Sequence, residues 1–271
     1  MMLNVSLGLM GHMLYYRECA MKRPAIWMWK KFIVAILVLA ILGVLEPVTA
    51  YEGDPSVAGV TVSGRVLYTG PLPKPERVPV HRDSVFCGET VSIDKIQVDR
   101  ASGGISDVVI SVEGIGRGKP LVPEKTVISF ENRTCRFVPR ASVAAVGSVL
   151  EILNTDPILH NTHIRVDNRL GQTIINVVQP AGVDVIMKSL QIAGLFDIRC
   201  DAHTFMQASM HVFEHPYYAL TDKTGRFEMA QVPAGTYRLR MWHEALGARS
   251  KTITVPSSGS LALDLGFGPE D

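Results

Sequence analysis

The sequence predicts an all-β protein built from two β-sandwiches. Short segments rich in Val and Ile recur along the chain, and Gly, Pro, Asn and Asp separate them, which is typical of strands joined by turns. No segment shows the 3.6-residue apolar repeat of a long helix. The residues after position 50 are numerous enough for one large hydrophobic core or two small ones.

Each predicted strand is a short β-branched or alternating run that ends at a turn residue. The first two are 60–68, which partly alternates, and 107–112, which Gly114 and Gly116 close. The predicted strands in the middle of the chain are 126–130, 148–153, 163–166, 174–178, 183–187, 194–198 and 209–213. Those in the last part are 218–221, 226–229, 236–242, 250–255 and 261–265.

Residues 1–50 have the pattern of a signal peptide and a segment preceding it. Lys and Arg residues come before an apolar run of 14 residues at 32–45, and Val48, Thr49 and Ala50 supply small residues at a cleavage site. A bilayer-spanning helix needs roughly twenty apolar residues, so cleavage is favoured over a retained membrane anchor. We therefore expect a periplasmic or secreted protein with no membrane span after cleavage.

The charges are nearly balanced. The chain has 27 Lys and Arg and 26 Asp and Glu residues, a formal net charge of +1. This balance gives no sign of a nucleic-acid partner.

Two segments carry residues that suit a metal ion. Cys200, His203 and Met206 lie within seven residues of one another, and His160 lies about forty residues earlier in an Asn-x-Asp-x-x-x-His-Asn-x-His pattern at 154–163. A thiolate, two imidazoles and a thioether are the ligands of a blue-copper centre. These ligands suit both copper oxidation states, so little has to move when an electron is transferred.

The predicted strands explain how these residues could meet. Cys200, His203 and Met206 share the connection between strands 194–198 and 209–213, while His160 comes from the connection after strand 148–153. In a Greek-key sandwich over residues 125–214, both connections lie at one end.

The two motifs resemble the cupredoxins, the plastocyanin and azurin superfamily, and the short Cys-x-x-His-x-x-Met loop is most similar to amicyanin. The resemblance implies one type 1 copper ion, with His160, Cys200 and His203 as ligands and Met206 as the axial ligand. It also implies that His163 does not bind metal. Asn161 is expected to hydrogen-bond near the Cys200 sulfur and to hold the two loops together.

The ligand loop departs from the family pattern. Amicyanin-like loops carry prolines where this chain has Ala202 and Thr204, and an aromatic residue often stands where this chain has Ile198. A less rigid loop would affect the reduction potential more than copper binding.

Three cysteines follow residue 50. If Cys200 is held as a metal thiolate, Cys87 and Cys135 can pair as a disulfide in an oxidising compartment. Two buried free thiols, or further metal ligands, are the alternatives, because sequence does not give the distance between them.

A second resemblance lies near the C-terminus. The turn motif Asp222-Lys223-Thr224-Gly225, followed by Val232-Pro233-Ala234-Gly235, looks like the carboxypeptidase regulatory-like or transthyretin-like (prealbumin-like) β-sandwich. Such domains begin with a Gly-x-Val strand, as at Gly64. We therefore expect residues 57–124 and 215–267 to form one smaller discontinuous sandwich into which the cupredoxin is inserted. A tandem arrangement is the alternative.

The remaining histidines have structural interpretations. His211 and His215 flank the last predicted strand of the cupredoxin-like sandwich, His81 suits the surface, and His243 suits a strand end. No nucleophile elbow, phosphate loop or His-Glu-x-x-His motif is present, and the His-x-His and His-Cys-His clusters of multicopper enzymes are missing too. The chain is therefore expected not to be an enzyme.

Two classes of function fit. The favoured one is a periplasmic electron carrier that meets a redox partner protein through the exposed edge of His203. The alternative is a copper-binding or metal-free sandwich that acts as an interaction or adhesion module without redox turnover. Reversible redox cycling is the property that separates the two.

Overall fold

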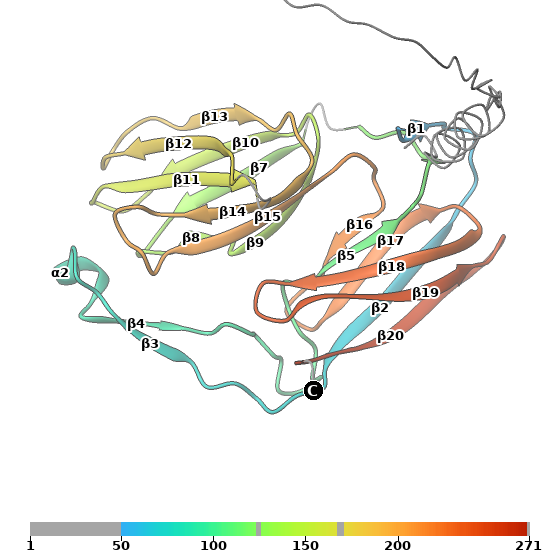
Figure 1. Ribbon diagram of the computed structural model, residues 1–271, viewed down its shortest axis with the longest axis horizontal. Helices are drawn as coiled ribbons and strands as arrows, with labels where there is room; N and C mark the ends of the chain where they lie inside the picture. The colour runs from blue at the N-terminus through green and yellow to red at the C-terminus, as the bar shows by residue number, and fades with distance from the viewer. Residues whose placement is uncertain (1–49, 123–125, 167–170, 270–271) are drawn as a thin grey trace, which may run out of the picture. The chain divides into compact units, whose positions relative to one another are not determined.

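The computed structural model describes residues 50–122, 126–166 and 171–269, which belong to one compact unit beginning at Ala50. Strands dominate these ranges, as the sequence predicted, and the helix within them is the single turn α2 (Ser84–Cys87) (Figure 1). No helix in the described ranges is both long and apolar enough to cross a bilayer. The predicted signal peptide lies, apart from Ala50, outside the described residues.

One sandwich combines strands from both ends of the described chain. Its first sheet has the order β16-β5-β18-β19 and its second the order β17-β2-β20. The strands of the first sheet are β16 (Tyr218–Leu220), β5 (Val109–Glu113), β18 (Gly235–His243) and β19 (Gly247–Val255). Those of the second are β17 (Arg226–Val232), β2 (Val60–Tyr68) and β20 (Ser260–Phe267). Inward side chains from both sheets, including Val62, Phe227 and Leu239, form a single core cluster.

The other sandwich is built from the middle of the chain. Its sheets have the orders β13-β10-β7-β8 and β12-β11-β14-β15-β9. The first sheet comprises β13 (Ile186–Ser189), β10 (Val149–Asn154), β7 (Val127–Asn132) and β8 (Phe137–Val138). The second comprises β12 (Thr173–Gln179), β11 (His160–Val166), β14 (Gly194–Arg199), β15 (Gln207–Phe213) and β9 (Ala141–Ala145). A separate core cluster, which includes Phe130, Ile164 and Phe196, lies between them. We call this the central sandwich.

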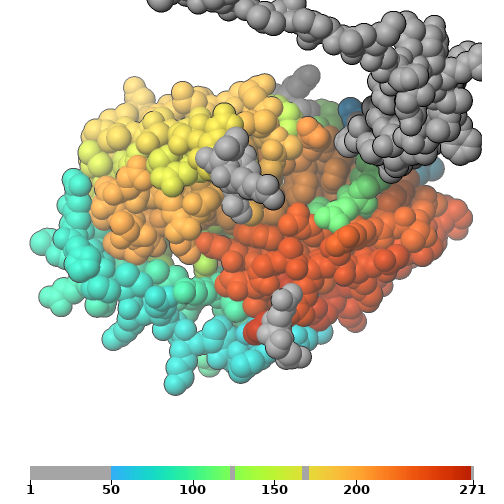
Figure 2. Space-filling view, in the orientation of Figure 1, coloured from blue at the N-terminus to red at the C-terminus, as the bar shows by residue number. Residues whose placement is uncertain are grey.

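A hairpin leaves the sandwich that contains β2 and β18, which we call the first sandwich, and reaches the central sandwich. Its strands β3 (Glu76–Pro79) and β4 (Thr90–Ile93) pair antiparallel, and α2 lies between them. Arg136 donates a hydrogen bond to the carbonyl of Ser92 over 2.8 Å, so this hairpin, cyan in Figure 2, contacts the central sandwich. A two-residue pair, β1 (Glu52–Gly53) with β6 (Arg117–Gly118), completes the strands.

One local expectation was wrong, and several short strands, β9 among them, were not predicted. His160 is the first residue of β11, paired with Gln179 of β12, instead of lying in a loop. β9 was not predicted, because Ala-Ser-Val-Ala-Ala has only one strongly strand-forming residue. It forms a strand because it pairs in parallel with β15.

Two buried histidines lie where β15 and β18 contact each other. The ring of His211 lies 4.5 Å from that of Trp242 and its Nε2 has no hydrogen-bond partner among the described residues. His243 ends β18, as expected for a strand-end residue. Burial lowers the pKa of both imidazoles to about 4, with nearby Arg240 and Arg140 adding smaller effects on His211 and His243 respectively.

We expect these two histidines to make the fold sensitive to acid. Their pKa is lower in the folded than in the unfolded chain. Their contribution to the free energy of unfolding is therefore complete above about pH 6.5 and is lost as the pH falls toward about 4. Each contributes at most on the order of 3 kcal/mol to the free energy of unfolding. Urea unfolding at several pH values should show a shallower acid dependence in His243→Asn than in the parent. The exposed His81→Asn control should match the parent; equal slopes in all three proteins would contradict the assignment.

Candidate metal centre

Three donor atoms converge at one end of the central sandwich. The Sγ atom of Cys200 lies 4.0 Å from Nδ1 of His160 and 3.7 Å from Nδ1 of His203. All three atoms lie within 4.8 Å of one another, and all three residues are buried. This is the separation that one shared ion can span, since metal bonds to sulfur and imidazole nitrogen are about 2.0 to 2.3 Å long.

Antiparallel pairing of β11 with β14 brings the two segments together. His163 lies opposite Arg199, which places the start of β11 beside Cys200. There the backbone amide of Asn161 donates to the Cys200 sulfur over 3.4 Å. The side-chain oxygen of Asn161 accepts from the amide of Asp201 over 3.1 Å, so Asn161 joins the two ligand segments.

The loop before His160 explains the spacing of the Asn-x-Asp-x-x-x-His pattern. The side chain of Asn154 accepts from the amide of Asp156 and donates to the carbonyl of Ile158. The Asp156 carboxylate, 4% exposed, lies 2.8 Å from Nε2 of His160. It also accepts from the amides of Thr134 and Cys135, over 2.6 and 2.8 Å.

Asp156 therefore fixes the imidazole that it contacts. Because a carboxylate accepts hydrogen bonds, the proton lies on Nε2 of His160 and the lone pair of Nδ1 faces the sulfur. Burial lowers the pKa of His160, and the hydrogen bond to Asp156 acts in the opposite direction. A neutral imidazole is the form that binds metal. The sequence motif contained Asp156, but its role had not been assigned.

His203 does not have the exposed edge that the sequence analysis expected. Its side chain is 0% exposed, and its Nε2 lies 3.0 Å from the carboxylate of Asp83, just before α2. Asp83 lies 120 residues earlier in the chain, so nothing in the local pattern around Cys200 pointed to this contact.

Met206 closes the ligand loop through its backbone. Its amide donates to the carbonyl of His203 over 2.9 Å, and its carbonyl accepts from the amide of Cys200 over 3.3 Å. The side chain is 2% exposed and belongs to the same core cluster as Cys200.

Other candidate ligands lie elsewhere or are already engaged. His163 lies beside Asp201 and Thr173 instead of in the three-residue cluster. Cys135, Asp156 and His160 form a second close group, but Cys135 is bonded to Cys87 in a disulfide. Cys200 is the free cysteine of the described residues.

The donor set fits a copper ion. Both imidazoles are held by carboxylates on Nε2, so both Nδ1 atoms are left to face one buried sulfur. Two imidazoles and a thiolate match copper better than a hard oxygen-seeking ion, and the two nearby carboxylates contact the Nε2 atoms, away from the Nδ1 atoms that face the sulfur.

A model of one family matches part of the chain. It describes polysaccharide lyase family 4, domain II, and matches residues 205–263. This stretch starts in the ligand loop and continues through β15 into β20. The matched family is not the carboxypeptidase regulatory-like family, so that assignment stays a prediction. Comparison with curated proteins gives no match.

Several solved structures are similar to about a third of the chain. A Cu-containing nitrite reductase from Thermus scotoductus SA-01 is 18% identical, with 36% of this chain and 24% of that chain covered and a TM-score of 0.30. A reduced amicyanin variant is 18% identical, with 33% and 84% covered and a TM-score of 0.29. A purple cupredoxin from Nitrosopumilus maritimus is 19% identical, with 33% and 100% covered and a TM-score of 0.27. The chain thus spans about a quarter of the nitrite reductase. The candidate centre rests on its own distances and donor chemistry.

We expect Asp156→Ala to destabilise the metal-free protein by about 3 kcal/mol, because two backbone amides and His160 lose their acceptor. Urea unfolding at neutral pH measures this loss. Asp201→Ala is the matched control: its carboxylate is half exposed beside His163, so the loss should stay below about 1 kcal/mol. Equal losses in the two variants would show that Asp156 does not organise the loop.

Proposed function

We propose that this protein is an exported type 1 copper protein that transfers electrons in the periplasm. One copper ion would be held by His160, Cys200 and His203, with Met206 as the axial ligand. The observation that carries this proposal is the convergence of two Nδ1 atoms and one buried sulfur within 4.8 Å.

The ligand chemistry supports electron transfer over static metal storage. When bound, a copper ion in such a site cycles between two oxidation states while the protein supplies ligands that suit both. This chain supplies a sulfur that accepts a hydrogen bond from the amide of Asn161. It also supplies two imidazoles whose Nε2 atoms contact carboxylates. Ligands held in this way move little during each electron transfer.

The compartment and the partner are part of the proposal. A disulfide between Cys87 and Cys135 suits an oxidising compartment, as does the predicted signal peptide. A carrier needs a redox partner protein, and the balanced charge of the chain favours no nucleic-acid partner. We propose a carrier instead of an independent catalyst.

We further propose residues 57–124 plus 215–267 as one discontinuous domain and residues 125–214 as the inserted copper domain. The support is strand pairing: β2 lies between β17 and β20, and β5 lies between β16 and β18. We also propose a carboxypeptidase regulatory-like, transthyretin-like relationship for the discontinuous domain, from the motifs at 222–225 and 232–235 and the Gly-x-Val strand at Gly64.

Copper loading tests the ligand assignment. We expect the Cu(II)-loaded protein to show an intense blue thiolate-to-copper charge-transfer band, and Cys200→Ser to show none. His163→Asn is the matched control and should keep the band, because His163 contacts Asp201 and Thr173 instead of the cluster. A colourless, weakly metal-binding parent would remove the proposal.

Redox titration tests the electron-transfer role. We expect the copper-loaded protein to pass repeatedly between Cu(II) and Cu(I) with superimposable oxidative and reductive curves, because both imidazoles are already fixed by Asp156 and Asp83. Far-ultraviolet circular dichroism should be the same in both states. Hysteresis, or release of Cu(I) on reduction, would favour the interaction-module alternative.

A further inference from the structure

The contact between Asp83 and His203 has no counterpart in the sequence motifs. Oδ2 of Asp83 lies 3.0 Å from Nε2 of His203, and the Asp83 side chain is 33% exposed while that of His203 is 0% exposed. The carboxylate therefore lies between the imidazole and solvent. Its position is set by the hairpin from the first sandwich, not by the strands that carry the ligands.

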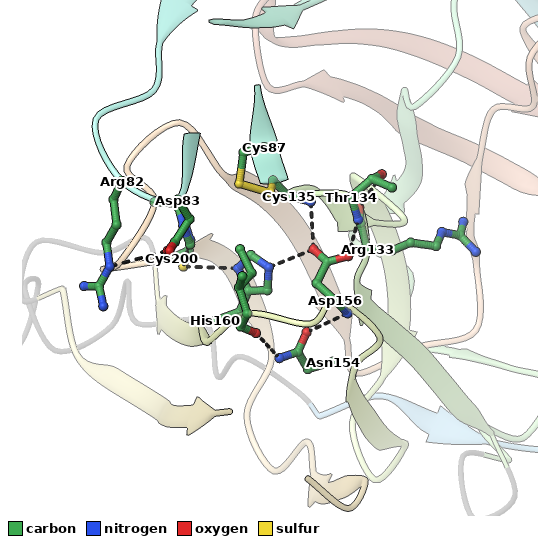
Figure 3. The surroundings of a disulfide bond; sticks show 12 residues. Arg82, Asp83, Cys87, Arg133, Thr134, Cys135, Asn154, Asp156, His160 and Cys200 are labelled. Carbon is green, nitrogen blue, oxygen red and sulfur yellow. Dashed lines mark hydrogen bonds and ion pairs between the residues drawn. A yellow bond between two sulfur atoms is a disulfide. The ribbon is translucent and has the colours of Figure 1, made fainter. Parts of the chain in front are cut away.

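A covalent tether holds Asp83 at the site. The amide of Cys87 donates to the carbonyl of Asp83 over 2.9 Å, closing the turn of α2. Cys87 is bonded to Cys135, whose amide donates to Asp156. Figure 3 shows the disulfide beside Asp83, Asp156, His160 and Cys200. Through the backbones of Cys87 and Cys135, one disulfide thus connects the two carboxylates that contact the imidazoles.

The backbone at Asp83 suits this task. Its φ of 57° and ψ of 31° lie in the left-handed region, which Asp tolerates better than most residues. Its side chain makes no capping hydrogen bond to α2; Oδ2 instead contacts His203 and lies 3.5 Å from Nε of the exposed Arg82.

We propose that α2 is a disulfide-tethered cap on the metal centre and that Asp83 is the positioning residue of His203. The carboxylate holds the proton on Nε2, so the Nδ1 lone pair faces Cys200, and the cap closes the outer edge of the imidazole. A molecule that approaches His203 along this edge meets Asp83 and α2 first. The proposal rests on the copper proposal and deepens it, because it gives the ligand His203 a positioning residue from outside the two ligand segments.

Asp83→Gly tests the cap in the metal-free protein. Glycine adopts the left-handed backbone without strain, so the variant removes the carboxylate and keeps the turn. The two readouts are heteronuclear NMR of the His203 ring nitrogens, which reports the tautomer, and the rate of Cys200 alkylation by neutral iodoacetamide, measured by peptide mass spectrometry. We expect loss of the Nε2–H tautomer preference and alkylation about tenfold faster, since a charged hydrogen bond closes the site.

Two variants serve as controls. Glu89→Ala removes an exposed carboxylate from the same hairpin, and its alkylation rate should stay within about twofold of the parent, because no charged hydrogen bond is lost. Asp83→Asn restores a neutral acceptor oxygen and should fall between parent and Asp83→Gly. An unchanged tautomer in Asp83→Gly would overturn the positioning role, and an unchanged alkylation rate would overturn the cap.

The tether is tested by Cys87→Ser combined with Cys135→Ser. We expect Cys200 alkylation to rise as in Asp83→Gly, because Asp83 loses its anchor; a rate equal to that of the parent would overturn the tether. If this pair fails to fold by circular dichroism, reduction of the parent disulfide by dithiothreitol supplies the same comparison. All readouts use metal-free protein, so a failure to bind copper and a failure of the cap give different results.

Discussion

The candidate centre depends first on the pairing of β11 with β14. This register sets the amide of Asn161 against the sulfur of Cys200 and the side chain of Asn161 against the amide of Asp201. A shift of one residue would turn every side chain of β11 to the other face of the sheet. The core residues Ile164 and Ile198, which lie opposite each other, resist such a shift because both would lose their buried places.

Two carboxylates accept hydrogen bonds from donors at this end of the sandwich. Asp156 accepts from two backbone amides and His160, and Asp83 accepts from His203. An unpaired buried carboxylate would cost several kcal/mol, and the three donors around Asp156 offset that cost. The same hydrogen bonds leave a lone pair on each Nδ1. Stability and ligand orientation thus come from the same contacts.

Sequence patterns predicted what depends on neighbours along the chain. Turn residues and β-branched runs predicted most strands, including β2 and β18, and the close spacing of Cys200, His203 and Met206 indicated a ligand loop. Long-range contacts were not predictable in this way. β9 pairs with β15, and His203 contacts Asp83, which no periodicity connects to residue 203.

The hairpin that carries α2 also gives a physical reason for the odd number of cysteines after residue 50. A thiol that is to serve as a ligand must stay out of disulfides, although its compartment favours them. Here Cys87 and Cys135 pair with each other, and their disulfide fixes the cap that lies over His203, beside buried Cys200. The two partner cysteines therefore do more than stiffen a loop. In the proposed cap they also hold Asp83 against His203, beside the remaining thiol.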